Sequence, residues 1–568
     1  MTIPAHSFGH KSTDAIKKNI PIIIACFLLV YIYPLGVRPL VVVDETRYAE
    51  IPREMVVSGD WIVPRLNGLR YFEKPVLGYW LNALSIKALG ENAFAVRLPA
   101  ALATGFTALI IFILTTAFAG GRGKGLLAAV VFLTSICVFS LGVTNILDSP
   151  LAFFFTCALG SFFLAWHNRA NKIKFYLLLL GAGISCGLAC LTKGFLGLAV
   201  PLLIIVPFLV WQKEWKTAVT TTVILTGMAI LVVTPWGIAI HMREPDFWRF
   251  FIWNEHIRRF LSDDAQHKRS FFYFFLVLPL GFFPWSALLP AAVTGLIKNK
   301  FDDPFVRFVV CWLVFPFLFF SVSSGKLATY VLPCFPPLAI LTATGLERFF
   351  RSGKTALFNG GTWLLTGLVV LFAAALLAIQ SQNEFLKNFI PTIETGKVFL
   401  LLAALLFFAA MTILSIKTDD PAKKICLFAL APIMLYFSSH FLLPEFVEKY
   451  RAPGRFLEKH AHQISSTSMI VSTKSAISAV CWYFKRDDVF LLSDGEGGEL
   501  QYGLSQADTR YRHLTFSRLY QLIADNKETN APVVLIIGEN KYRRKKNELP
   551  QPGYVDTNGK DGFVLVVY

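Results

Sequence analysis

Apolar segments long enough to cross a membrane recur along most of the chain, from residue 20 to about residue 443. A helix that spans a bilayer needs roughly 20 predominantly apolar residues. The pattern predicts about thirteen spans, at residues 20–40, 94–118, 126–144, 150–166, 175–191, 195–211, 217–240, 271–294, 306–322, 331–347, 361–380, 398–416 and 425–443. We therefore expect a mainly α-helical, polytopic membrane protein whose transmembrane domain covers residues 1–444.

The last part of the chain, residues 445–568, has a different pattern. Short runs typical of strands alternate there with stretches of helical periodicity, and this alternation predicts a small α/β domain. Neither a phosphate loop, a nucleophile elbow nor a metal-ligand spacing can be identified in this part of the sequence. The predicted strands lie at residues 469–472, 489–493, 533–537 and 563–568, and the predicted helices at 474–485 and 516–525.

Composition narrows the class of protein further. Of 568 residues, 55% are hydrophobic and only 16% are charged, which excludes a soluble enzyme of ordinary composition. The net charge of +17 comes from Lys and Arg residues scattered between apolar segments, so it favours anionic membrane lipids over nucleic acid as partners. Eight of the nine cysteines lie in or beside apolar segments, and their spacing indicates neither a disulfide framework nor a zinc site.

The distribution of basic residues predicts the orientation in the membrane. Lys11, Lys17 and Lys18 precede the first apolar segment, which we interpret as a retained signal anchor with a cytoplasmic N-terminus. Alternation then places the C-terminal domain and the loops 41–93 and 241–270 on the outer side. Each of these two loops carries six Lys or Arg residues, against the positive-inside rule, so we expect them to bind phosphate.

Two acidic residues are candidates for catalysis at this outer side. Asp44 directly follows the apolar run Val41–Val43, and Asp148 lies between two apolar segments without a basic neighbour nearby in sequence. Acids at a membrane boundary are costly to desolvate, which favours a functional role. The alternatives are that Asp44 merely ends a membrane helix and that Asp148 caps the helix beginning at Ser149 and Pro150.

Basic residues and a tyrosine on the same side are candidates for holding a phosphate. Lys74 lies in an aromatic and acidic segment, Lys326 and Tyr330 follow a Ser-Gly turn, and Arg258 and Arg259 lie in an aromatic-rich loop. Arg binds phosphate through its bidentate fork and Lys as a point charge. Any one of them could instead be an interfacial cation that extends its side chain to the membrane surface without binding a ligand. Residues that could support the site are Glu73, Arg47, Arg258 and His256.

A metal site has weak support in the sequence. Glu73 and His256 could bind a divalent ion, but two ligands on separate loops are a poor metal signature. Lys193 has no stronger interpretation than a polar residue at the membrane interface. We expect that no cofactor is required.

Several motifs, in this order, carry a resemblance to a known family. The motifs are Asp44-Glu-Thr-Arg-Tyr-Ala-Glu, Gly59-Asp-Trp-Ile-Val-Pro, Phe72-Glu-Lys-Pro with Tyr79-Trp80, Asp148, Glu255-His-Ile-Arg-Arg-Phe, and Gly325-Lys-Leu-Ala-Thr-Tyr-Val-Leu-Pro. Together they resemble the bacterial aminoarabinose transferases that modify lipid A, which are C-type membrane glycosyltransferases related to protein O-mannosyltransferases.

The resemblance covers roughly residues 20–445 and implies a fold and a set of roles. It implies thirteen spans with a periplasmic C-terminal domain, acidic site residues at Asp44 and Asp148, and contacts of Lys74, Arg259 and Tyr330 with an undecaprenyl phosphate donor. The expected activity is transfer of an amino sugar, 4-amino-4-deoxy-L-arabinose, to a phosphate of lipid A at the periplasmic face of the bacterial inner membrane, a modification linked to polymyxin resistance.

Two other functions stay open from the residues themselves. A related transferase with another sugar or with a protein or glycan hydroxyl as acceptor would need Asp44 as a general base. A transporter of lipid-linked sugars is the other alternative, but transporters place polar residues near the membrane midplane, whereas here they gather at one side.

Overall fold

The computed structural model describes residues 20–258, 268–297, 302–380, 394–495, 497–526 and 531–568, and for residues 254–258 it describes the backbone only. The chain divides into two compact units. Unit 1 consists of Met1–Pro34, Ala100–Thr234 and Arg259–Leu442, and unit 2 of Leu35–Pro99, Pro235–Arg258 and Leu443–Tyr568.

Long apolar helices make up most of unit 1, as the hydropathy pattern predicts. Nine helical segments of the described chain are long and apolar enough to cross a membrane. They are α4 (Ala93–Phe118), α7 (Asp148–His167), α8 (Lys172–Lys193), α10 (Trp215–Arg243), α14 (Pro304–Val322), η5 (Ala328–Cys334) with α15 (Phe335–Arg351), α16 (Ala356–Gln380), α18 (Thr395–Lys417), and α19 (Pro421–Leu430) with α20 (Ile433–Ser439).

Four more apolar segments differ from a straight, full-length span. α5 (Arg122–Leu133) and α6 (Ile136–Gly142) meet at 67°, and α12 (Tyr273–Gly281) meets the segment Trp285–Ile297, formed by η4 (Trp285–Leu288) and α13 (Leu289–Ile297), at 98°. Ile20–Gly36 and α9 (Leu196–Trp211) are shorter apolar helices. Helix therefore occupies all thirteen predicted stretches, whereas thirteen membrane crossings stay a prediction.

The two bends have identifiable causes and contact each other. At the first, the hydroxyls of Thr134 and Ser135 donate to carbonyls one turn back, at 2.6 and 2.7 Å, which is a known cause of helix bending. At the second, Pro284 lies in the break and has no backbone N–H to donate. The Nε1 of Trp285 donates to the Thr134 Oγ1 at 2.8 Å, so the two breaks support one another.

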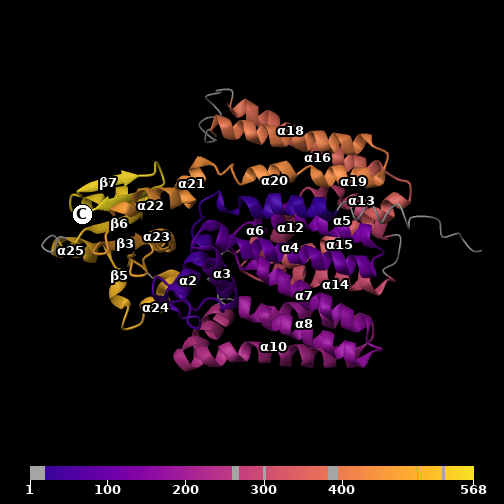
Figure 1. Ribbon diagram of the computed structural model, residues 1–568, viewed down its shortest axis with the longest axis horizontal. Helices are drawn as coiled ribbons and strands as arrows, with labels where there is room; N and C mark the ends of the chain where they lie inside the picture. Colours follow the sequence, from indigo (N-terminus) through magenta and orange to yellow (C-terminus); the bar gives the residue numbers. More distant parts are fainter. Residues whose placement is uncertain (1–19, 259–267, 298–301, 381–393, 496, 527–530) are drawn as a thin grey trace, which may run out of the picture. The chain divides into compact units, whose positions relative to one another are not determined.

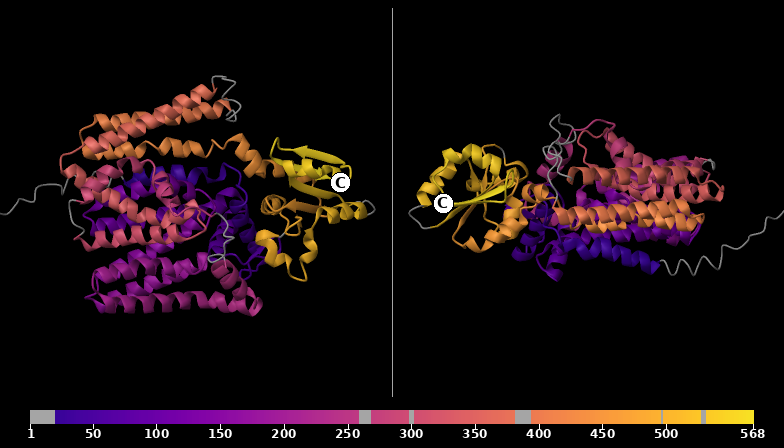
Figure 2. Two further views of the ribbon diagram at one scale, coloured as in Figure 1. Left: turned by 180° about the vertical axis from the view of Figure 1, so that it is seen from behind. Right: turned by 90° about the horizontal axis from the view of Figure 1, so that it is seen from above.

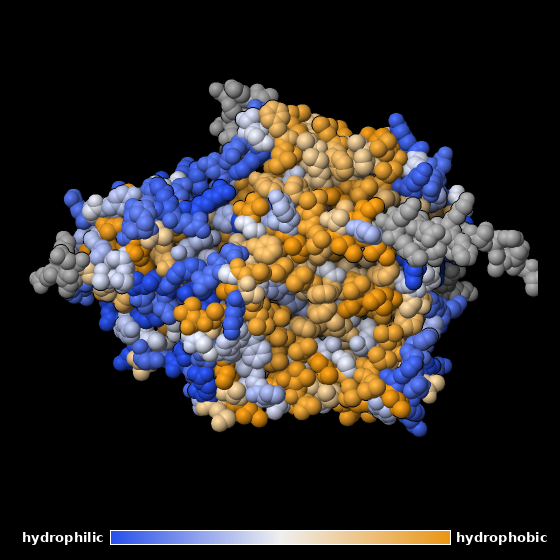
Figure 3. Space-filling view, in the orientation of Figure 1, coloured by the Kyte–Doolittle hydropathy of each residue, from blue (hydrophilic) through white to orange (hydrophobic). Residues whose placement is uncertain are grey.

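The outer faces of the membrane helices are apolar. α16 and α18 lie side by side in opposite views (Figures 1 and 2). Leu364, Leu368 and Leu371 on α16 are each more than half exposed. The space-filling view shows hydrophobic side chains covering the helices (Figure 3). Contiguous apolar surface of this kind is typical of a lipid-facing protein, and the chain is a multi-pass membrane protein.

Unit 2 contains the N-terminal outer loop and the C-terminal α/β region. The loop forms α2 (Asp44–Ser58), the hairpin β1 (Arg65–Leu66) and β2 (Leu69–Arg70), and α3 (Leu77–Leu89), while the second loop contributes the π-helix η3 (Arg249–Arg258). On α2, Glu45 binds the fully buried Arg97 of α4 through two hydrogen bonds of 2.7 and 2.8 Å. This charge pair fixes the start of α2.

The C-terminal region forms a six-stranded mixed sheet in the order β5-β4-β3-β6-β8-β7. Strands β5, β4, β3 and β6 are parallel, and β8 and β7 are added antiparallel. The strands are β3 (Met469–Thr473), β4 (Phe490–Leu492), β5 (His513–Leu514), β6 (Val533–Gly538), β7 (Tyr554–Thr557) and β8 (Phe563–Val567).

Short helices precede and connect these strands. They are α21 (Glu445–Arg451) and α22 (Gly454–His460) before β3, and α23 (Ile477–Phe484), α24 (Gln501–Leu504), α25 (Phe516–Asn526) and α26 (Glu539–Lys545) between the strands. α25 buries Phe516, Leu519 and Ile523 against one face of the sheet. The predicted small C-terminal α/β domain is thus confirmed, while its exact boundary at residue 445 stays a prediction.

Candidate active site

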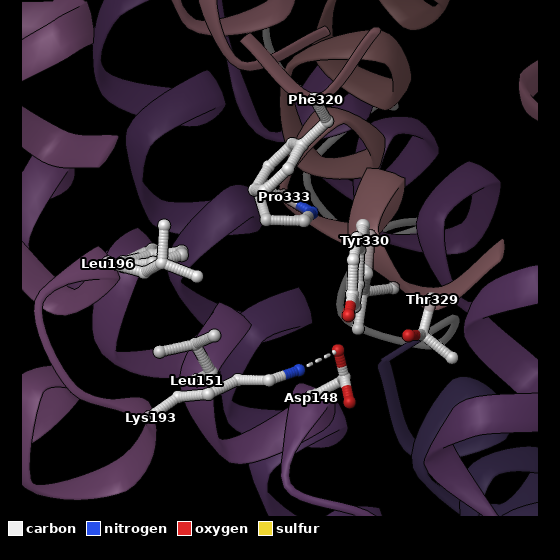
Figure 4. A pocket seen from close by; sticks show the side chains of 10 residues that line it. Asp148, Leu151, Lys193, Leu196, Phe320, Thr329, Tyr330 and Pro333 are labelled. Atoms are coloured by element: carbon white, nitrogen blue, oxygen red, sulfur yellow. Dashed lines mark hydrogen bonds and ion pairs between the residues drawn. The ribbon is translucent and has the colours of Figure 1, made fainter. Parts of the chain in front are cut away.

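A pocket in unit 1 is lined by residues of five helical segments, α7, α8, α9, α14 and η5 (Figure 4). Asp148 and Lys193 lie at one side of it and Thr329 and Tyr330 at another. The rest of the lining is apolar or aromatic: Leu151, Phe155, Leu196, Phe320, Leu332 and Pro333. The pocket therefore combines an apolar wall with a small number of ionisable groups, which is the composition typical of ligand sites.

The packing of α7 and α8 explains why Asp148 and Lys193 meet. Asp148 is the first residue of α7 and Lys193 the last of α8, and the two helices are joined by a short polar turn at residues 168–171. Successive helices with so short a connection are antiparallel, so these two ends lie together. The Lys193 Nζ lies 2.8 Å from the Asp148 Oδ1, with side chains 14% and 15% exposed. It also lies 5.2 Å from the centre of the Tyr330 ring.

This pair corrects the interpretation of Asp148 as a carboxylate without a basic neighbour. Lys193 is distant from Asp148 in sequence and close to it in space, so it is more than a polar residue at the membrane interface. The signal that could have found it is the polar turn at 168–171, which predicts a hairpin of two long helices. Counting along that hairpin places Asp148 and Lys193 at the same end.

Lys326 is held by backbone carbonyls in the described structure. Its side chain is buried, and the Nζ donates to the carbonyl of Arg269 at 3.1 Å and to that of Ser323. Burial lowers the pKa of the Lys326 ammonium. The expected contact of Lys326 with a phosphate stays a prediction.

In unit 2, Asp44 and Arg47 lie one turn apart at the start of α2. Asp44 is 65% exposed and Arg47 is 7% exposed. The guanidinium of Arg47 forms ion pairs with Asp44 and with Glu499 of the C-terminal region. It also lies 5.1 Å from the Tyr48 ring and 6.0 Å from the Tyr71 ring. An exposed carboxylate thus stands beside a buried cation.

Glu499 is a residue that the sequence did not single out. Burial by itself would raise the pKa of this carboxyl, but the positive charges of Arg47, Lys474 and Lys74 outweigh it and lower the pKa below the ordinary value. Glu499 therefore stays ionised within a cluster of cations. No motif surrounds it, so only the fold shows that it reaches the start of α2.

The segment around Lys74 is fixed by local hydrogen bonds. The hydroxyl of Tyr71 donates to the Glu73 Oε2 at 3.0 Å, and the Lys74 Nζ donates to the Glu73 carbonyl at 2.9 Å. Tyr71 is buried, and this burial raises the pKa of its hydroxyl. Glu73 is therefore already engaged with Tyr71.

The remaining predictions concern residues or contacts that the structure leaves undescribed. Arg259 and the side chains of His256 and Arg258 lie outside the described residues. Among the described residues no group of three or more His, Cys, Asp or Glu side chains could hold a metal ion. The weakly supported metal at Glu73 and His256 is thus untested, and the phosphate site expected of the basic residues on the outer side stays a prediction.

Comparisons with known proteins assign the chain to a family. The family model for dolichyl-phosphate-mannose-protein mannosyltransferase matches residues 18–251, and the model for the arabinosyl transferase ArnT C-terminal domain matches residues 448–567. Two relatives called undecaprenyl phosphate-alpha-4-amino-4-deoxy-L-arabinose arabinosyl transferase are similar over almost their full length. That from Shewanella sediminis is 36% identical over 98% of this chain and 99% of its own. That from Aeromonas salmonicida is 37% identical over 91% and 93%. The chain belongs to this arabinosyl transferase family.

Membership of the family confirms the class of enzyme. The chain is a glycosyltransferase, and the resemblance carried by its motifs is confirmed. The match at residues 448–567 extends it to the C-terminal domain, which lies beyond the residues 20–445 that the resemblance covers.

Solved structures of the arabinosyl transferase family share the fold. Crystal structures of ArnT from Cupriavidus metallidurans, one bound to undecaprenyl phosphate and one in the apo state, each match with a TM-score of 0.81 at 21% identity. The match covers 97% of this chain and 98% of the other. The C-type glycosyltransferase fold is thus confirmed.

Proposed function

We propose that the protein transfers 4-amino-4-deoxy-L-arabinose from undecaprenyl phosphate to a phosphate of lipid A at the periplasmic face of the inner membrane. The observation that carries this proposal is the match of both parts of the chain to arabinosyl transferases, including residues 448–567. The names of the relatives supply the donor and its sugar. The lipid A acceptor follows from the resemblance of the motifs.

The unit 1 pocket has the chemistry that a lipid-linked sugar phosphate requires. As the bond between the sugar C1 and the phosphate oxygen breaks, negative charge grows on the leaving undecaprenyl phosphate and positive charge on C1. We assign the stabilisation of the former to Lys193 and Tyr330 and that of the latter to Asp148, which the ion pair of Lys193 with Asp148 and its position near the Tyr330 ring support. Preorganised charges of this kind lower the barrier without proton transfer.

The residues predicted from the sequence would serve the donor phosphate and the acceptor. We propose that Lys74, Arg259 and Tyr330 each contact the donor phosphate, and that Asp44 orients the acceptor or the sugar amine. A phosphate acceptor is anionic at neutral pH and attacks C1 without a strong general base, which suits the exposed and paired Asp44. The transfer then needs no cofactor, and we expect activity to persist in excess EDTA.

The test is the mass of lipid A from cells with and without the gene. Transfer adds one amino-pentose to lipid A, and Asp148→Asn should lower the rate of that addition about 100-fold at equal protein level. Unmodified lipid A with the gene expressed, together with sugar on protein or glycan, would refute the phosphate acceptor.

The variant Asp44→Asn distinguishes transfer to a phosphate from transfer to a hydroxyl. A hydroxyl acceptor needs Asp44 as a base, so its transfer should be lost, whereas a phosphate acceptor should leave residual activity.

A protein acceptor is the second candidate, and one observation favours it. Residues 18–251 match the model for protein mannosyltransferases. That model, however, covers none of residues 448–567, which match the arabinosyl transferase C-terminal domain. Measuring the mass of lipid A with and without the gene, as described above, decides between the two acceptors.

A further inference from the structure

Lys474 occupies a position of the C-terminal sheet at which parallel α/β folds bind ligands. It directly follows β3, which comes first in the chain among the strands of this sheet, and precedes α23. In the sheet, β3 lies between β4, the next strand in the chain, and β6, a later strand on its other side. Ligands of such sheets bind beyond the carboxyl ends of the strands where the strand order reverses in this way. Lys474 lies at that point.

The surroundings of Lys474 are adapted to its side chain. A Cβ added at Gly498 would lie 1.7 Å from the Lys474 Nζ, and Gly498 has a φ of +61°. The backbone conformation therefore favours glycine at this position, and the end of the Lys474 side chain lies against it. The glycine-rich segment that precedes Glu499 thus leaves room for the ammonium.

Lys474 is the least engaged of three cations whose charge acts on Glu499. Arg47 is paired with Asp44 and Glu499, and Lys74 donates to a carbonyl. Lys474 is exposed and, within the described part of the chain, makes neither an ion pair nor a hydrogen bond. Its three N–H donors are thus available to an incoming anion.

We propose that Lys474 binds the phosphate of the acceptor, so that the C-terminal domain contributes an acceptor subsite beside Arg47 and Glu499. This inference rests on the proposed function and names a residue for the acceptor. The reaction handles two phosphates, one on the donor and one on the acceptor. Lys74 belongs to the outer loop assigned to the donor, whereas the exposed Lys474 lies at the carboxyl end of the interior strand β3, which suits a polar headgroup.

The experiment measures both substrates with full-length enzyme in detergent, using purified lipid A and undecaprenyl phosphate-linked aminoarabinose. Lys474→Gln should raise the KM for lipid A about tenfold, because a hydrogen bond to a charged group is lost. The KM for the donor and kcat should stay within about twofold of wild type. The rise of the acceptor KM with added NaCl should also be weaker in this variant than in wild type.

Two variants serve as controls. Lys474→Arg keeps the charge and should restore most of the acceptor affinity. Lys560→Gln removes the same charge from an exposed turn between β7 and β8 of the same sheet and should leave both KM values unchanged. Equal thermal midpoints of all variants would show that folding is intact.

Three outcomes would overturn the inference while wild type remains active. A rise in the donor KM alone would place the donor phosphate at Lys474. A fall in kcat alone would mean that Lys474 acts through Glu499, and unchanged kinetics would remove it from the site. Wild-type enzyme without transfer to lipid A would instead overturn the proposed function together with this inference.

Discussion

Asp148 and Lys193 form the charged part of the unit 1 pocket, and neither is fully buried. Each side chain is about 15% exposed, so the pair keeps access to a ligand while most of its surroundings are protein. A partly desolvated charge pair interacts more strongly than one in water. Removing either charge therefore changes the electrostatic environment of the other inside the pocket.

We expect Lys193→Met and Asp148→Asn each to lower the turnover of sugar transfer by about 100-fold, since each removes one preorganised charge. Turnover is measured by mass spectrometry of the modified lipid. Lys172→Met, at the exposed opposite end of α8, is the matched control and should behave as wild type. Wild-type turnover of Lys193→Met would exclude the pair from the reaction.

Glu499 should make the stability of the protein depend on pH. Its folded-state pKa is lower than the ordinary value of 4.5, since the charge of Arg47 outweighs burial. A carboxyl with a lowered pKa stabilises the fold above its unfolded pKa, and that contribution is lost as the pH falls through the folded value. The difference in free energy of unfolding between wild type and Glu499→Gln should therefore be constant from about pH 7 to 5, near 2 kcal/mol, and shrink below the unfolded value.

Thermal unfolding in detergent between pH 7 and pH 3 measures this difference. Glu548→Gln, which breaks an exposed pair with Lys545, is the control and should leave the stability at neutral pH close to that of wild type. A difference that grows toward low pH would contradict the assigned direction of the Glu499 shift.

At the scale of elements, small residues decide how closely α8 and α10 approach. Gly183 and Gly187 on α8 face Met228 and Val232 of α10, and a Cβ added at either glycine would lie 2.6 Å from the Cβ of its neighbour. The spacing of four residues places both glycines on one face of the helix. Such pairs allow the backbones of membrane helices to pack closely.

Gly187→Val should therefore destabilise the protein by about 1 to 3 kcal/mol through overpacking against Val232. Gly181→Val on the same helix is the matched control, because nothing lies within 4 Å of a Cβ added there. The measurement is the thermal midpoint of both variants in detergent. Equal midpoints would mean that α10 shifts without loss of stability.

At the scale of the whole molecule, the distribution of charge predicts the orientation in the membrane. The proposed periplasmic position of the C-terminal domain follows from alternation of the spans and from the basic inner loops. Alkaline phosphatase fused after Tyr568 should be active in cells, because this enzyme functions only outside the cytoplasm. A fusion after Lys354, in a predicted inner loop, should be inactive, and the reverse pattern would overturn the orientation.

The sequence predicted the elements of this membrane fold better than their shapes. Each of the thirteen apolar stretches is helical, because hydrophobicity and length alone require helix in a bilayer. The bends at Thr134 and Pro284 could not be predicted from the sequence, because they involve side chains from different helices that contact each other only in the folded protein. The short strands β5 and β7 were also missed, because two to four residues carry too little periodicity.

The sequence by itself determined the class of protein, its helices, its C-terminal α/β domain and its family, because these follow from composition, periodicity and ordered motifs. Asp44 and Asp148 could be singled out as charges beside apolar segments, and Lys74 as a cation in an aromatic and acidic segment. Only the tertiary structure decided that Lys193 pairs with Asp148 and that Glu499 pairs with Arg47. The partners in these pairs are separated by 45 and 452 residues, and a contact over such distances arises from packing, which no local pattern records.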